Sequence, residues 1–163
     1  MTFGILEFKL LLLLGVANVA PIAAWRLLGK RWNRSLDGGW RLPDGQPLFG
    51  PSKTRRGIIA AMLLTPLAAV MLHFPVITGF IIAAGAMVGD LFSSFIKRRF
   101  KQPVSSMAPL LDQIPESLLP LLLLQQYYAL TWTQMISIVL AFIIAEVLLS
   151  RLLYRFGLRK RPY

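Results

Sequence analysis

The strongest constraint on the fold is a run of 33 residues, from Gly57 to Gly89, that contains no Asp, Glu, Lys or Arg. An α-helix needs about 20 apolar residues to cross a bilayer, so this run is too long for one span. The sequence His-Phe-Pro at 73–75 divides it into two. A second uncharged run, 117–145, is interrupted by the polar and aromatic segment 125–134. Because 56% of the chain is hydrophobic, more than a soluble domain of this size can bury, the sequence predicts an integral membrane protein.

Five transmembrane helices are expected, in a single all-α membrane domain that includes residues 1–163. The first follows Phe3, and dividing the two uncharged runs gives the other four. A Tyr-Tyr pair and a nearby Trp in the second division fit an interfacial aromatic belt. The expected spans are 4–26, 57–72, 76–96, 114–128 and 133–153.

The Lys and Arg residues predict how these helices are oriented. Of the 18 basic residues, 17 lie in the three segments 26–56, 97–101 and 151–161, and the turns expected on the opposite side carry none. Basic residues concentrate in cytoplasmic loops. We therefore expect the loops 27–56 and 97–113 and the C-terminus to face the cytoplasm, and the N-terminus to lie outside. This topology explains the net charge of +11 without a nucleic-acid partner.

The composition also limits the chemistry. There is no cysteine, which excludes thiolate catalysis and Cys-ligated zinc, and a single histidine, His73, excludes most His-based metal sites. Any reaction has to depend on carboxylates, hydroxyls and cations.

Two aspartates flank a basic cluster at the cytoplasmic end of the third predicted span. Asp90, Ser94 and Lys97 are spaced by four and three residues, so they form one stripe on a helix. A carboxylate facing lipid there would cost about a few kcal/mol, so Asp90 is expected to face the helix bundle. One interpretation is an intrahelical salt bridge to Lys97 through Ser94. The other is a divalent ion shared with Asp112, because Mg²⁺ binds one or two carboxylates together with phosphates and water.

The first cytoplasmic loop ends in the sequence GPSKTRRG at 50–57. A turn followed by hydroxyls and cations at the start of a helix is suited to bind phosphate through backbone amides, Lys53 and Arg56. Ser52 or Thr54 can cap this helix. The alternative is that these cations only follow the bias of cytoplasmic loops.

Two polar residues lie within predicted spans, Asn18 in the first and Glu146 in the fifth. We expect Glu146 to bond to a neighbouring helix or to reach Asn18, and a functional role stays open for both.

Two blocks of the sequence resemble a known family. The block GDLFSSFIKRRFKQ at 89–102, followed by PLLDQIP at 109–115, resembles the signature of the CDP-archaeol synthases, which are similar to the bacterial phosphatidate cytidylyltransferases. The block 36–57, with LDGG and DGQPLFGPSKTRRG, resembles the first cytoplasmic loop of the same family. The resemblance extends over about residues 10–153. The segment 101–106 departs from the family pattern by its lack of glycine, which leaves the lipid acceptor open.

The resemblance implies a Mg²⁺-dependent enzyme of phospholipid biosynthesis in the cell (inner) membrane, with its site on the cytoplasmic face. It would move CMP from CTP to a lipid phosphate, of the archaeal isoprenoid ether type or related, and release pyrophosphate. The implied metal ligands are Asp90 and Asp112, and Lys97 joins them as a catalytic residue. The implied nucleotide- and phosphate-binding residues are Lys53, Thr54, Arg56, Ser94, Arg98 and Arg99. Further candidates for binding cytosine, ribose or a second ion are Asp37, Asp44 and Ser52.

Two other functions stay open at this stage. One is a phosphatidate cytidylyltransferase that acts on a diacyl lipid. The other is a non-enzymatic small transporter or a scaffold that binds anionic lipids, although a transporter should carry more polar residues near the bilayer midplane. The expected partners are CTP, a lipid phosphate and the bilayer, and the sequence leaves a homodimer open.

Overall fold

A computed structural model of the chain describes residues 3–29, 31–104, 106, 108 and 110–155. These residues form five α-helices and no named strand. The helices are α1 (Ile5–Leu28), α2 (Arg55–Met71), α3 (Val76–Arg99), α4 (Gln113–Tyr128) and α5 (Trp132–Arg155). The all-α prediction is confirmed, and each helix begins and ends within a few residues of an expected span. The basic tail beyond Arg155, expected to face the cytoplasm, lies outside the described residues.

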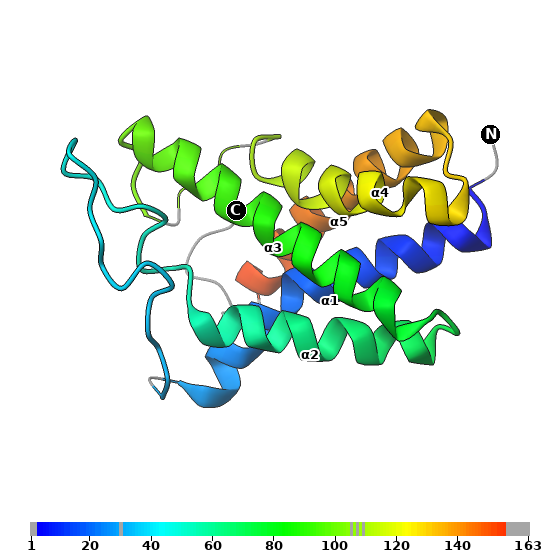
Figure 1. The fold of residues 1–163 in the computed structure, drawn as a ribbon, viewed down its shortest axis with the longest axis horizontal. Helices are drawn as coiled ribbons and strands as arrows, with labels where there is room; N and C mark the ends of the chain where they lie inside the picture. Colours follow the sequence, from blue (N-terminus) through cyan, green and yellow to red (C-terminus); the bar gives the residue numbers. More distant parts are fainter. Residues whose placement is uncertain (1–2, 30, 105, 107, 109, 156–163) are drawn as a thin grey trace.

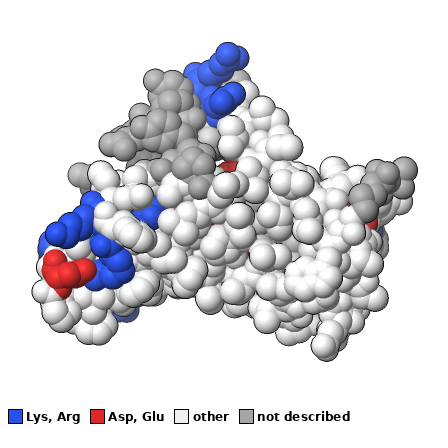
Figure 2. All heavy atoms as spheres, turned by 90° about the horizontal axis from the view of Figure 1, so that it is seen from above, with Lys and Arg blue, Asp and Glu red and all other residues white. Residues whose placement is uncertain are grey.

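Successive helices run in alternating directions (Figure 1). The two long connections, 29–54 and 100–112, therefore lie at one end of the bundle. The short turns 72–75 and 129–131 lie at the other end, close to the N-terminus. Figure 2 shows Lys and Arg gathered in two groups, one of them at the end with the long connections, while most of the remaining face is uncharged.

Among the described residues, three helices are long and apolar enough to cross a membrane: α1, α3 and the part of α5 from Trp132 to Leu152. The helices α2 and α4 have 17 and 16 residues. At about 1.5 Å per residue they are shorter than a hydrocarbon core of about 30 Å. The membrane character is therefore supported, whereas five complete crossings and the orientation of the termini stay predictions.

Glycine lets α3 pack closely against α4. A Cβ atom added at Gly85 would lie 2.8 Å from the Cα atom of Pro120, and one added at Gly89 would collide with the backbone carbonyl of Pro115. Small residues at such contacts allow two helix backbones to approach, as is common in membrane bundles. This contact places Asp90, the residue after Gly89, beside the first turn of α4.

Most buried charged side chains lie in a different half of the bundle from the large buried apolar ones. Leucine, isoleucine and methionine side chains fill the half near the short turns, and the fully buried ones include Leu10, Leu13, Leu14, Ile82, Leu121, Leu124, Met135 and Ile138. Towards the long connections the buried side chains become polar or charged, and they include Arg56, Ser93, Ser94, Lys97, Arg98, Gln113 and Glu116. Burying charge is unfavourable unless it is paired, so this second half is where a functional site is expected.

Candidate active site

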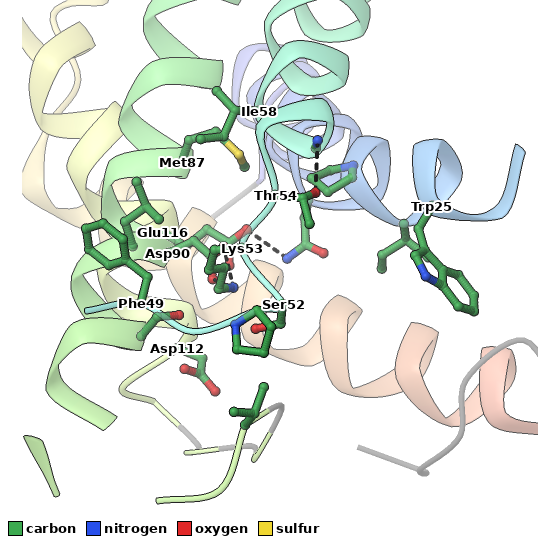
Figure 3. Close-up of a pocket in the computed structure, with 18 of the residues that line it drawn as sticks. Trp25, Phe49, Ser52, Lys53, Thr54, Ile58, Met87, Asp90, Asp112 and Glu116 are labelled. Carbon is green, nitrogen blue, oxygen red and sulfur yellow. Dashed lines mark hydrogen bonds and ion pairs between the residues drawn. The ribbon is translucent and has the colours of Figure 1, made fainter. Parts of the chain in front are cut away.

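A cavity of about 710 Å³ lies in this polar half, at the end with the long connections (Figure 3). Its size falls in the range of about 300–1,000 Å³ typical of small-molecule sites. All five helices and the loop before α2 contribute to its wall. Apolar residues of α1, including Ile22 and Trp25, form one side, and charged residues of the loop, α3 and α4 form another.

Most of the candidate residues line this cavity. They are Ser52, Lys53, Thr54, Asp90, Ser94, Lys97, Arg98 and Asp112. The two sequence blocks that carry the resemblance therefore meet in one place. The remaining candidates, Asp37, Asp44, Arg56 and Arg99, do not line it.

The first contact between the two blocks is an ion pair between Lys53 and Asp90. The Lys53 ammonium lies 2.5 Å from Oδ1 and 2.6 Å from Oδ2 of Asp90, so it donates to both carboxylate oxygens. The side chains are 22% and 26% exposed. Burial disfavours the ammonium form of Lys53, but the charge and hydrogen bonds of the Asp90 carboxylate raise the pKa of Lys53 above its ordinary value.

A second ion pair joins Lys97 to Asp112. Lys97 Nζ lies 2.6 Å from Asp112 Oδ1 and donates to the carbonyl of Ser106 at 3.0 Å. Asp112 Oδ2 accepts a hydrogen bond from the Ala108 amide at 2.9 Å. Oδ1 is buried against the Lys97 ammonium and accepts no further hydrogen bond from the described residues. The intrahelical bridge between Asp90 and Lys97 does not form, because each pairs with a different segment that packs against α3.

A third carboxylate, Glu116, lies at the same cavity. It is 6% exposed, and its Oε1 accepts a hydrogen bond from the side-chain amide of Asn18 at 2.9 Å. Asn18 thus reaches α4, and Glu146 also lines the cavity from α5. Sequence reasoning missed Glu116 as a site residue. Its position one helical turn after Asp112 was the available signal, since residues four apart share a helix face.

Ser93 and Arg98 of α3 hold the connection between α3 and α4 in place. Ser93 donates to the carbonyls of Gly89 and Leu111 at 2.9 and 2.6 Å, which ties α3 to the connection before α4. Arg98 donates to the Pro103 carbonyl at 3.0 Å through one terminal nitrogen. Its Nε is buried without an acceptor among the described residues. Arg98 also lines the cavity, where its positive charge favours an anion.

Asp37, Asp44 and Arg99 shape the loop instead. Asp37 accepts hydrogen bonds from the amides of Gly39, Phe49 and Gly50 at 3.0, 3.1 and 2.9 Å. Burial opposes the charged form, but these amides together hold the pKa of Asp37 below its ordinary value. Asp44 pairs with Arg99, and the amide of Gln46 and this guanidinium lower the pKa of Asp44.

Arg56 and Thr54 fix the start of α2. Arg56 is 5% exposed and donates to the carbonyls of Gly29 and Arg31 at 2.7 and 2.6 Å, where α1 ends. Thr54 caps α2 by accepting a hydrogen bond from the Gly57 amide at 3.3 Å, as one of the two expected caps. Together they hold Lys53 at the cavity.

The donor set suits a magnesium ion that arrives with phosphate ligands. Within the described residues, no group of three or more His, Asp or Glu side chains is placed to hold a metal alone. Asp90 and Asp112 both line the cavity, and Asp112 Oδ1 is buried with no aligned donor. Mg²⁺ binds through one or two carboxylates plus substrate phosphates and water, so these residues fit that ion.

Comparisons with known proteins decide the family. The family model described as CarS-like CDP-archaeol synthase matches residues 4–163. The chain belongs to the CDP-archaeol synthase family. It is 35% identical to the CDP-archaeol synthase of Aeropyrum pernix over 177 aligned positions, which cover 98% of this chain and 93% of that protein. It is also 36% identical to the CDP-archaeol synthase of Thermofilum pendens over 104 residues, where the match spans 61% of this chain and about half, 51%, of that protein.

A solved structure agrees with this assignment. It is described as an intramembrane enzyme for archaeal membrane lipids biosynthesis, and its fold matches with a TM-score of 0.75. The match covers 88% of this chain and 92% of the other, at 29% identity. Membership of the CDP-archaeol synthase family supports the prediction of a membrane cytidylyltransferase over the diacyl and non-enzymatic alternatives. The magnesium ion, the roles of single residues, a homodimer and the cytoplasmic position of the site stay predictions.

Proposed function

We propose that this chain transfers CMP from CTP to the phosphate of an archaeal-type isoprenoid ether lipid and releases pyrophosphate, at the cytoplasmic surface of the membrane. One observation carries the proposal: the Lys53–Asp90 ion pair brings the GPSKTRRG loop and the GDLFSSFIKRR helix to one cavity. That cavity combines cations for phosphates with carboxylates for a metal ion. The basic residues in the two long connections at this end of the bundle support the cytoplasmic orientation.

The reaction needs no nucleophilic side chain. An oxygen of the lipid phosphate attacks the α-phosphorus of CTP, and the bond from this phosphorus to the oxygen of the β-phosphate breaks. What the protein has to provide is alignment of two anions and stabilisation of the charge that builds up on pyrophosphate. Lys53, Lys97 and Arg98 line the cavity and are suited to both tasks.

Asp90 and Asp112 would hold Mg²⁺ together with phosphate oxygens and water. When bound, this ion would neutralise charge on the triphosphate as a Lewis acid. The Asp112 side chain is already oriented for that role. The Ala108 amide donates to Oδ2, and Oδ1 faces the Lys97 ammonium, where a positive charge is accommodated. Ser94, one turn along the stripe from Asp90, is 3% exposed and borders the same cavity.

The α1 wall is suited to the lipid chains. Pro21, Ile22 and Trp25 line the cavity opposite the charged residues, and 51% of the Trp25 surface is exposed. Figure 3 shows Trp25 on α1, away from the cluster of Lys53, Asp90 and Glu116. A lipid whose phosphate reached Lys97 and Arg98 could extend its chains along this apolar side into the bilayer.

The test is a turnover assay with the purified full chain in lipid nanodiscs, labelled CTP and Mg²⁺. The acceptors are a geranylgeranyl ether glycerol phosphate, a saturated archaeal ether analogue and a diacyl phosphatidic acid. We expect CDP-lipid and pyrophosphate in equal amounts with the ether acceptors, and slower product formation with the diacyl lipid. Equal rates with both classes would contradict the acceptor assignment, and no product with any acceptor would contradict the activity.

A further inference from the structure

Both carboxylates proposed to hold the metal are already neutralised by lysines of this chain. Lys53 donates to both oxygens of Asp90 at 2.5 and 2.6 Å. Lys97 lies 2.6 Å from Asp112 Oδ1, the oxygen that accepts no aligned hydrogen bond. The same two lysines are the residues proposed to bind the phosphates of CTP. The site therefore contains two ion pairs. In each pair the carboxylate is also proposed to bind the metal ion, and the lysine is also proposed to bind a phosphate of CTP.

These pairs oppose binding of a bare divalent ion. Mg²⁺ requires carboxylate oxygens at about 2.0–2.1 Å and loses its water reluctantly. An ammonium group a few ångströms away repels it in a site that is largely shielded from water. Binding of the free ion would also leave the partly buried Lys53 and the buried Lys97 without their carboxylates, which is unfavourable.

A nucleoside triphosphate removes this obstacle because it brings the missing anions. Its magnesium complex keeps a net negative charge, so the carboxylates can take the ion while the lysines take the phosphates. The Lys side chain suits such an exchange, since its charge sits on a flexible four-carbon stem. Lys53 is the freer of the two, as Lys97 is also held by the Ser106 carbonyl.

We propose that Lys53 and Lys97 act as exchangeable counter-ions: they occupy Asp90 and Asp112 while no nucleotide is bound and transfer to the triphosphate when the metal–nucleotide complex enters. This inference rests on the proposed function and adds a binding order to it. Free metal binds weakly, and metal and nucleotide bind with positive cooperativity. By linkage, each raises the affinity for the other by the same factor.

The experiment measures metal binding without turnover. Mn²⁺ affinity for the full chain in nanodiscs is followed by the loss of the free-ion electron paramagnetic resonance signal. It is measured alone and with the CTP analogue in which a methylene group bridges the α- and β-phosphorus. The analogue also binds Mn²⁺ in solution, and the loss of signal from this complex is measured in samples without protein and subtracted. We expect the analogue to tighten Mn²⁺ binding by roughly 5- to 150-fold, the usual range of coupling between two ligands. Equal Mn²⁺ affinity with and without the analogue overturns the proposal, and this result needs no variant.

Two variants test the lysines directly. Lys53→Met and Lys97→Met release one carboxylate each, so we expect tighter Mn²⁺ binding in the absence of nucleotide and weaker binding of the analogue. The matched control is Lys101→Met, which removes an exposed cation next to the site that does not line the cavity. Unchanged nucleotide-free affinity in both variants overturns the proposal. The same gain in Lys101→Met also overturns it, because net charge would then explain the effect.

The proposed function and the exchange fail in different ways. If the protein forms CDP-lipid but binds Mn²⁺ equally well with and without the analogue, only the counter-ion exchange is overturned. If it forms no CDP-lipid and does not bind Mn²⁺ in the presence of the analogue, both the proposed function and the exchange are overturned.

Discussion

The Lys53 ammonium donates to both carboxylate oxygens of Asp90, at 2.5 and 2.6 Å, although the two residues lie 37 positions apart. This ion pair joins the loop before α2 to the cavity-facing stripe of α3. It holds a cation for phosphate and a carboxylate for metal within direct contact, in a cavity that also contains Lys97, Asp112 and Glu116. The raised pKa of Lys53 keeps its charge through neutral and moderately alkaline pH.

Replacing Asp90 tests the catalytic assignment. In Asp90→Asn the proposed metal ligand loses its charge, and Lys53 loses its counter-ion. Because metal-assisted charge stabilisation contributes several kcal/mol, we expect CDP-lipid formation to fall about 100-fold or more. The measurement is the turnover rate with labelled CTP, alongside the amount of protein in the membrane fraction. The control Glu7→Gln makes the same chemical change at the opposite end of the bundle, where the side chain pairs with Gln134. Near-normal turnover in Asp90→Asn would exclude the metal role.

Trp25 tests the lipid wall. Its side chain lines the apolar side of the cavity and is half exposed. In Trp25→Ala we expect the KM for the lipid acceptor to rise about 10-fold or more, since a large apolar contact is lost, while the KM for CTP changes little. Initial rates over a matrix of CTP and lipid concentrations separate the two constants. The exposed Trp32, which does not line the cavity, supplies the control Trp32→Ala. A rise in the KM for CTP alone would place the nucleotide, not the lipid, against α1.

Gly89 tests the close approach of α3 and α4. The added methyl of Gly89→Ala would collide with the Pro115 carbonyl, so the helices have to separate. We expect a loss of about 1–3 kcal/mol in the free energy of unfolding, as found for overpacked sites, together with lower activity as Asp90 shifts. Thermal unfolding in detergent gives the first quantity. The control Gly15→Ala, where an added Cβ meets nothing within 4 Å, should be neutral or slightly stabilising. Equal melting temperatures for the two variants would contradict the packing argument.

Asp37 tests the order of the first loop. Its folded pKa is depressed, so the carboxylate stabilises the loop above the ordinary aspartate pKa of about 3.9 and the stabilisation is lost as pH falls through the lower folded value. At neutral pH the amides of Phe49 and Gly50 donate hydrogen bonds to the Asp37 carboxylate. The variant Asp37→Ala should therefore increase hydrogen exchange at these two amides. The control Asp44→Ala should act on Gln46 instead. Unchanged exchange at Phe49 and Gly50 would show that the loop is held by other contacts.

The helices were predictable because the membrane imposes a local requirement. A segment that crosses the apolar core has to satisfy its backbone groups within itself, so an uncharged run of sufficient length defines a helix. The break at Pro75 and the turn before Trp132 divided the two uncharged runs close to the residues at which α3 and α5 begin. Charge placement likewise put both functional blocks at one end of the bundle, as the structure shows. The cap at Thr54 was also a local signal, read from a hydroxyl before a helix.

The pairing of charges was not predictable in this way. The stripe of Asp90, Ser94 and Lys97 is present, yet its two charged members bind Lys53 and Asp112 from other segments. Arg56 and Arg99, which resemble phosphate ligands in the sequence, hold the end of α1 and the loop around Asp44. Which ion pairs form depends on the rotation of each helix about its axis and on where the loop before α2 packs against α3. The spacing of residues along one helix carries no information about either.

The sequence by itself determined the membrane fold class, the ends of the helices, the gathering of cations at one end and the two blocks that identify the family. Each of these follows from length, polarity or local capping. Only the tertiary structure decided which cations reach the cavity, that Asn18 pairs with Glu116, and that lysines cover both aspartates. The physical reason is that glycine contacts such as Gly89 against Pro115 set the distance and rotation between helices, and those contacts join residues far apart in the chain.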